Sequence, residues 1–156
     1  MRYVSDILAA KKKSEIYTIS PNETVYTAIN FIAKMNIGAL LVTENNRLEG
    51  TISERDYARK VILKGKLSRT TKVCEIMTNK TLHVSPKCRI EQCMSTMLDN
   101  QVRDLPVLDN DLLVGLVSME DVMKDILNEK EFVIDELSKY IAGSPMYKSG
   151  YYSQVN

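Results

Sequence analysis

The sequence predicts an α/β (α+β) fold of two pseudo-symmetric β-α-β-β-α repeats packed sheet to sheet, with flanking N- and C-terminal helices. First, residues from Ile16 onward align without a gap to residues 81–127 at a constant offset of 65. Second, the apolar positions of the long helix recur in both copies. Third, the same Gly, Ser and Asp end each copy's last strand. A unit repeated only twice is not a solenoid, so the copies should pack on each other about an approximate two-fold axis.

In the first half, residues 1–10 predict a short amphipathic helix, 16–19 a strand and 24–35 a second helix. That helix carries an apolar stripe made of Val25, Ala28, Ile29, Ile32 and Ala33. The apolar run 38–42 predicts a buried strand, and residues 48–52, after a polar turn, predict the next strand. Ser53 should then begin a helix that reaches Leu63, with Gly65 as its stop.

The second half repeats this order after residues 73–77, which match the pattern of residues 4–8. Its helical stripe consists of Ile90, Cys93, Met94, Met97 and Leu98. A further helix is predicted from Glu129 to Ile141. The expected units are therefore residues 1–65 with the N-terminal helix, residues 66–143 with the C-terminal helix, and a flexible tail at 144–156.

Composition excludes several classes of protein. The 156 residues include 21 basic and 20 acidic side chains, a net charge of +1, so nucleic-acid binding has no electrostatic support. Three cysteines without CxxC spacing argue against a disulfide framework and a zinc site, and they suit a reducing, cytoplasmic location. We expect neither a membrane span nor a signal peptide, because no long apolar run occurs near the start.

The repeated turn, Gly50 to Asp56 and again Gly115 to Asp121, has two interpretations. An Asp carboxylate can accept hydrogen bonds from both hydroxyls of a ribose, and a helix start attracts phosphate. The glycines would keep the strand end clear for a ligand. Alternatively, Ser-x-x-Asp before an apolar helix is a capping box. The two interpretations are compatible, because a capping serine can keep a lone pair free.

With the Leu-Pro-Val of residues 105–107 and the paired G-x-x-S-x-x-D turns, the repeat resembles the tandem CBS-domain pair, or Bateman module, over about residues 1–142. The run from Gly50 to Lys60, and Tyr140 to Gly143, look closest to stand-alone bacterial members with relatives in plant mitochondria. The resemblance implies a cleft that binds AMP, ADP or ATP, or in some members NAD(H) or S-adenosylmethionine. It also implies disc-shaped homodimers and a regulated partner protein that it does not name.

The same resemblance implies two ligand sites, each joining a turn of one repeat to a strand of the other. The first would comprise Thr51, Ser53, Asp56, His83, Val84 and Arg103. Arg55, just after the turn, is added to this site as a phosphate contact, with a solvent-facing or dimer role as its alternative. The second would comprise Tyr17, Thr18, Ile19, Leu116, Ser118 and Asp121. Arg103 should make the first site prefer phosphate, because Gly38 holds the equivalent place in the other repeat. Asp104, where relatives often carry His, weakens the expectation for ATP relative to AMP or NAD(H).

Other residues carry weaker hypotheses. His83 is the only histidine and lacks a metal partner in the sequence, so no metal site is expected. Cys88 precedes a predicted helix, where a lowered pKa would make its thiol redox-active. The main function expected is a nucleotide-sensing regulatory module. The alternatives are a structural interaction protein with vestigial ligand sites and, with less support, an enzyme, because the sequence shows no acid/base pair, metal cluster or P-loop.

Overall fold

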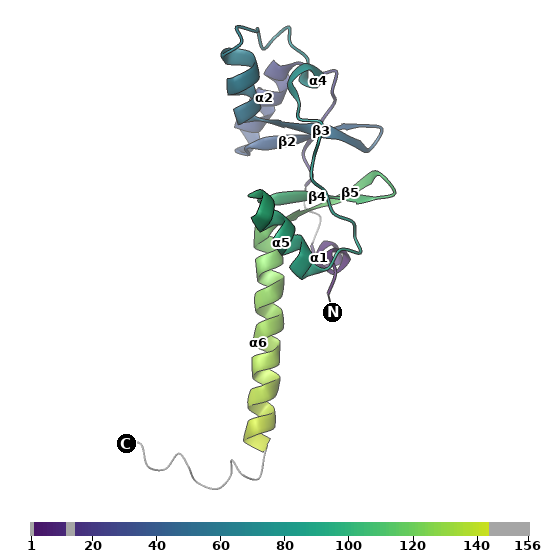
Figure 1. Cartoon of the computed structure of the whole chain (residues 1–156), viewed down its shortest axis with the longest axis vertical. Helices are drawn as coiled ribbons and strands as arrows, with labels where there is room; N and C mark the ends of the chain where they lie inside the picture. The colour runs from purple at the N-terminus through teal and green to yellow at the C-terminus, as the bar shows by residue number, and fades with distance from the viewer. Residues whose placement is uncertain (1, 12–14, 144–156) are drawn as a thin grey trace, which may run out of the picture.

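The computed structural model describes residues 2–11 and 15–143 (Figure 1). The tail predicted at 144–156 lies outside the described residues. Five strands form one sheet in the order β1-β2-β3-β5-β4. The strands are β1 (Thr18–Ile19), β2 (Ala39–Glu44), β3 (Arg47–Ser53), β4 (Asp104–Asp109) and β5 (Leu112–Ser118).

The two halves of the sheet repeat each other in detail. The β2–β3 hairpin has a register shift between Val42 and Thr43, and the β4–β5 hairpin has one between Val107 and Leu108, at the same offset of 65. The hairpins lie as separate layers (Figure 1), and the ladder between them is the single pair Arg47 and Leu112. The expected α+β fold of two pseudo-symmetric repeats is confirmed.

The two helices of 11 residues also match. They are α2 (Val25–Met35) and α5 (Ile90–Asn100). Each ends on a residue in the left-handed conformation, Asn36 with φ 54° and Gln101 with φ 55°. Such a residue lets the chain leave the helix and turn directly into the following strand.

Each half has its own apolar core, and the two halves exchange short helices. The N-terminal helix α1 (Val4–Ala10), grouped by sequence with the first repeat, buries Val4 and Ile7 in the second core. The helix α4 (Val73–Ile76) instead buries Val73 and Ile76 in the first core. Each core is therefore completed by a helix that precedes the other repeat in the chain.

Three sequence-based expectations were wrong in detail. The helix from Ser53 to Leu63 is a short α-helix, α3 (Glu54–Tyr57), followed by a π-helical turn, η1 (Ala58–Ile62). The segment at His83 forms only an isolated bridge between Val84 and Val107 instead of a strand.

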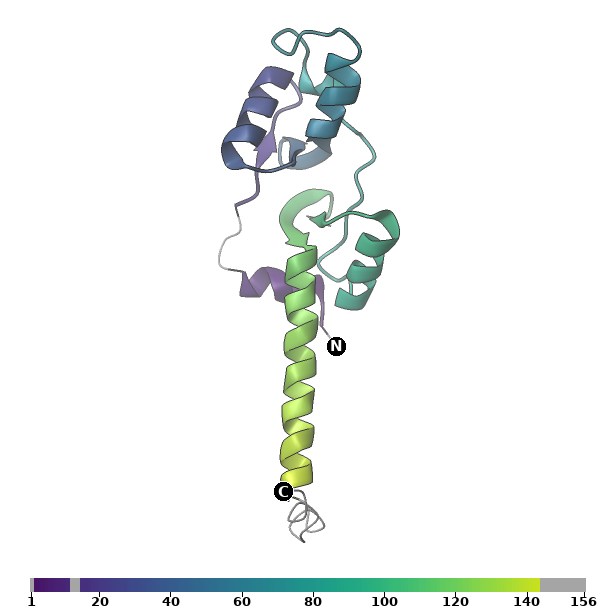
Figure 2. The same ribbon diagram turned by 90° about the vertical axis from the view of Figure 1, so that its left-hand side faces the viewer.

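The C-terminal helix also differs from the prediction, because α6 (Met119–Gly143) is continuous. A separate helix was expected from Glu129 to Ile141, but no glycine or proline stands between Met119 and Ala142. Without a helix-breaking residue, the intrahelical hydrogen bonds continue through the expected break. Both views show α6 extending away from the two hairpins (Figures 1 and 2).

Candidate functional site

A cleft of about 760 Å³ lies between the two repeats. Its lining is itself pseudo-symmetric, because most of the lining residues pair at the offset of 65. The pairs are Glu15 and Lys80, Tyr17 and Leu82, Ile37 and Val102, Gly38 and Arg103, Ala39 and Asp104, Leu40 and Leu105, Leu41 and Pro106, and Thr51 and Leu116. The cleft therefore lies where the approximate two-fold axis relates the repeats.

Four of the predicted site residues line this cleft: Tyr17, Thr51, Arg103 and Leu116. They come from both predicted sites, so the structure joins the two half-sites in one space. The Tyr17 ring packs edge-on against Phe31, with ring centroids 5.6 Å apart, which fixes the ring at the cleft wall.

The first turn is a fully formed capping box. The Ser53 hydroxyl accepts from the Asp56 backbone N–H at 3.1 Å, and the Ser53 N–H donates to Asp56 Oδ2 at 2.9 Å. The other carboxylate oxygen, Oδ1, receives the Lys60 ammonium at 2.9 Å. The hydroxyl of Thr78 reaches the same oxygen at 3.4 Å, and Thr78 lines the cleft. Asp56 therefore contacts a residue that lines the cleft but does not line the cleft itself.

The second turn has the same cap but a different lysine. The Ser118 N–H donates to Asp121 Oδ2 at 2.8 Å, and the Ser118 hydroxyl accepts from the Asp121 N–H at 3.1 Å. Lys11, just after α1, forms an ion pair with Asp121 and donates to the Leu116 carbonyl at 3.1 Å. Position 125, equivalent to Lys60, is Asp125, which pairs with Arg2 at 2.6 Å. The cation for the second turn therefore comes from the N-terminal segment.

These contacts keep both turn carboxylates ionised. Desolvation, the largest single influence, acts to raise the pKa of Asp56, but hydrogen bonds from Lys60 and Ser53 outweigh it and the pKa is lowered. The pKa of Asp121 is lowered in the same way, with desolvation outweighed by Lys11 and Ser118. Both groups can accept hydrogen bonds at neutral pH.

The two turn glycines serve chain packing, which corrects the expectation that they clear space for a ligand. A Cβ on Gly50 would lie 2.5 Å from the backbone carbonyl oxygen of Thr78. On Gly115 it would lie 2.6 Å from a methyl carbon of Leu8 in α1. Each glycine thus admits the segment that crosses from the other repeat.

Charge divides the cleft unequally. The second repeat contributes Lys80, Arg103 and Asp104, whereas the first contributes Glu15 as its charged residue among those that line the cleft. Desolvation by the cleft wall raises the pKa of Asp104, and Asp121 nearby adds to this, against the opposing effects of Lys11 and Arg103. An anion that enters beside Arg103 therefore also meets Asp104.

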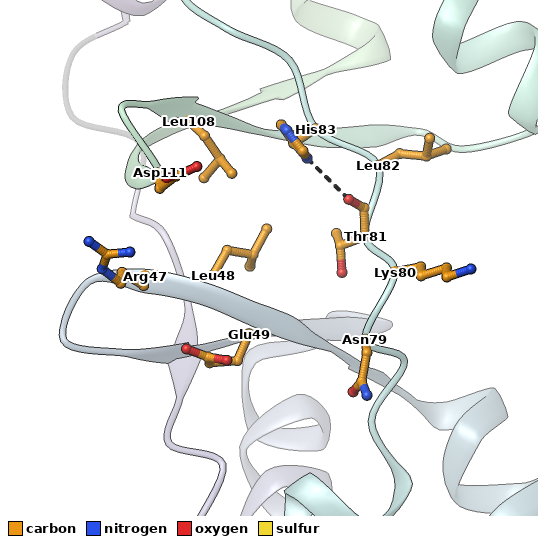
Figure 3. Close-up of a pocket in the computed structure, with 10 residues that line it drawn as sticks. All are labelled: Arg47, Leu48, Glu49, Asn79, Lys80, Thr81, Leu82, His83, Leu108 and Asp111. Carbon is orange, nitrogen blue, oxygen red and sulfur yellow. Dashed lines mark hydrogen bonds between the residues drawn. The ribbon is translucent and has the colours of Figure 1, made fainter.

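His83 lines a second pocket of about 550 Å³ (Figure 3), and residues 80–82 line both this pocket and the cleft. Its Nδ1 is 3.3 Å from the Thr81 carbonyl oxygen. The Thr81 hydroxyl is buried without a hydrogen-bond partner among the described residues. His83 therefore lines the neighbouring pocket, whereas Thr51 and Arg103, with which the resemblance grouped it, line the cleft.

The remaining predicted residues lie outside the lining of the cleft. Ile19 packs against the first core, and Val84 is buried in the second. Thr18 pairs with Leu41 in the sheet, and the Arg55 side chain is exposed on α3.

The pKa of the Cys88 thiol is opposite to the lowered value that the redox hypothesis requires. Desolvation raises the pKa of its thiol, which lowers the thiolate fraction that oxidation needs.

Sequence reasoning did not identify the two lysines that hold the turn carboxylates. Lys60 was detectable, because it stands four residues after Asp56 on the same helical face. Lys11 carried no such signal, because it is 110 residues from Asp121 in the chain. Glu15 and Lys80 were detectable as an opposite-charge pair at the offset of 65.

The CBS domain family model matches residues 4–63 and 73–128, the two repeats just described. The chain belongs to the CBS-domain family. Among curated proteins it is similar to the mitochondrial CBS domain-containing protein CBSX3 of Arabidopsis thaliana, at 36% identity over 148 residues, 90% of this chain and 72% of that protein. The expected CBS-domain pair is confirmed.

Two solved CBS-domain structures extend the comparison. A putative signal-transduction protein from Burkholderia ambifaria shares 43% identity at a TM-score of 0.69, covering 81% of this chain and 95% of that one. A CBS domain protein from Pyrobaculum aerophilum, solved in complex with AMP, shares 21% identity at a TM-score of 0.63, covering 77% of this chain and 89% of that one. At that identity the second structure establishes a common fold.

Two further features are absent from the described residues. None of their helices combines the length and hydropathy of a membrane span. Their His, Cys, Asp and Glu side chains form no group of three or more that could hold a metal ion.

Proposed function

We propose that this CBS-domain pair is a regulatory sensor that binds an adenine nucleotide in the inter-repeat cleft and modulates a partner protein. The observation that carries the proposal is the cleft itself, because residues from both repeats line it at equivalent positions. A ligand that touches both repeats binds more tightly to one relative arrangement of them, and only such a difference can switch a protein between states.

The chemistry of the lining suits a mononucleotide. Apolar residues of both repeats offer a surface for a base, and Thr51 with the nearby Asp56 offers oxygens for ribose hydroxyls. Arg103 supplies the charge for a phosphate. AMP is the best match, because Asp104 opposes each additional phosphate charge. The proposal includes as alternative ligands ADP, ATP, NAD(H) and S-adenosylmethionine. We also propose that the protein is a homodimer and is located in the cytoplasm.

Thermal unfolding with AMP and isothermal titration calorimetry test the proposal directly. A ligand that binds the native state at a hundred times its Kd stabilises it by about 2.7 kcal/mol, a shift of several degrees in Tm. ADP, ATP, NADH and S-adenosylmethionine form the comparison series, and adenosine isolates the phosphate. Mass spectrometry of small molecules released by denaturation identifies a ligand that purifies with the protein.

The competing function is a structural interaction protein with vestigial sites. The lysines on Asp56 and Asp121 favour it, because they already satisfy the carboxylates that a ribose would use. Absence of any Tm shift across the series, with no released molecule, would establish this alternative. Conversion of a bound nucleotide, followed by chromatography, would instead reveal an enzyme.

A further inference from the structure

The outer part of α6 carries an unusual set of exposed apolar side chains. Every residue from Leu127 to Ala142 is exposed, and Figures 1 and 2 show this part of the helix clear of both hairpins. Exposed fractions are 55% for Leu127, 63% for Ile134, 56% for Leu137 and 45% for Ile141. Helices in proteins gain most of their stability by packing an apolar face, so these exposed side chains indicate a packing partner.

The spacing of the apolar residues specifies what kind of partner fits. Met123, Leu127, Lys130, Ile134, Leu137 and Ile141 follow one another at alternating intervals of four and three residues. We call these six positions the α6 stripe. An alternating four–three interval is the heptad pattern by which two helices pack along their length, knobs into holes.

The charges of the helix leave this face open for pairing. At 100° per residue, the acidic residues Glu131, Asp135 and Glu136 fall outside the α6 stripe, and Lys130 is its one charged member. Lys139 forms ion pairs with Asp135 at 2.6 Å and with Glu136 at 3.2 Å, away from the stripe. Val133 and Tyr140 widen the apolar face on one flank, where paired helices often carry charges.

We propose that the α6 stripe pairs with the α6 stripe of a second copy of this chain, in antiparallel orientation. A parallel pair in register would place Lys130 against Lys130 of the second copy, two like charges at one buried position. The antiparallel register instead sets Lys130 beside Ile134 and Leu127 beside Leu137. This inference rests on the homodimer of the proposed function and identifies the surface that forms it.

Sedimentation equilibrium of the full chain tests the pairing, with Leu137→Asp as the disrupting variant. The expected result is a dimeric wild type and a monomeric variant, or a dimer weakened at least about a hundredfold by a buried charge. Phe132→Asp is the matched control, since Phe132 is 66% exposed on the opposite face. It should remain dimeric. Circular dichroism and AMP titration show that the variants keep their fold and their ligand site.

Disulfide trapping tests the orientation in a Cys74→Ser background, because Cys74 is exposed. A mixture of Leu127→Cys and Leu137→Cys proteins should form the mixed disulfide faster than either protein forms its own. Faster self-linking of each variant would overturn the antiparallel orientation. A Leu137→Asp protein that stays fully dimeric would overturn pairing through α6 but keep the homodimer, whereas a monomeric wild type would overturn both. None of these outcomes bears on the proposed nucleotide binding, which calorimetry measures separately.

Discussion

Arg103 is the one cleft cation whose counterpart at the offset of 65 is an uncharged glycine, Gly38. We expect Arg103→Ala to lower the affinity for AMP by about tenfold or more, the cost of a lost hydrogen bond to a charged group. Affinity for adenosine should stay unchanged, because adenosine has no phosphate. Calorimetry with both ligands measures the difference, and Lys64→Ala, which alters a residue of neither pocket, is the control. Equal losses for the two ligands would contradict the role of Arg103.

Asp104 should act in the opposite direction. Desolvation already raises its pKa, and a bound phosphate would raise it further, so the complex takes up a proton. AMP affinity should therefore increase as pH falls through the pKa of Asp104 in the complex. Asp104→Asn should tighten AMP binding at pH 7.5 roughly three- to tenfold by removing a like charge.

The comparison of wild type and Asp104→Asn also removes a complication. The AMP phosphate itself gains a proton near pH 6, and this affects both proteins alike. The difference between their titrations at several pH values therefore reports Asp104 alone. Parallel pH profiles in the two proteins would show that Asp104 lies away from the phosphate.

Among the elements, α1 is tied to the second turn by the ion pair between Lys11 and Asp121. Because the folded pKa of Asp121 is lowered, its contribution to stability is present above the unfolded pKa of about 3.9 and is lost as pH falls through the folded value. Lys11→Met should lower the free energy of unfolding at pH 7 by about 1 kcal/mol.

Urea unfolding at pH 7 and in acid measures this contribution. The gap between Lys11→Met and wild type should narrow as Asp121 is protonated in both proteins. Lys124→Met is the matched control, because Lys124 pairs with Glu120 on the exposed surface of α6. It should change stability little at either pH. A gap for Lys11→Met that persists unchanged in acid would indicate lost packing instead of a lost ion pair.

Gly50 and Gly115 should differ in how well they tolerate an added side chain, because different groups pack against them. Gly50→Ala should destabilise the fold by about 1–3 kcal/mol, because the added methyl meets the Thr78 carbonyl, a backbone group paired with Thr51. Gly115→Ala should cost less, because it meets the flexible side chain of Leu8. Urea midpoints of the two variants decide the order, and a reversed order would contradict the assignment of Thr78 as the rigid neighbour.

At the scale of the whole molecule, the cleft lies between two cores whose halves of the sheet are joined by a single residue pair. We expect saturating AMP to slow amide hydrogen exchange in residues 37–41 and also in residues 102–106, because both segments line the cleft. Exchange measured by mass spectrometry, with adenosine as a second ligand, maps the protection. Protection limited to one repeat would mean that the ligand does not bridge the repeats, and the switching mechanism would then fail.

The sequence by itself determined the repeat and its local structure, because apolar periodicity and capping residues act within a few positions. Ser53 with Asp56 and Ser118 with Asp121 formed the caps that their spacing predicts. The cleft residues recur at the offset of 65 because the two repeats align at that offset and fold alike.

Only the tertiary structure decided which distant segments complete each repeat. The packing of α1 on the second core and the contact of Lys11 with Asp121 join residues that are far apart in the chain, 110 positions in the case of Lys11 and Asp121. The placement of His83 in the pocket beside the cleft likewise depends on the path of residues 80–82, which line both spaces. The repeated turn with which each copy ends is therefore both a helix cap and the point where the other repeat makes contact. Its local geometry follows from sequence, and its neighbours follow from how the two cores pack.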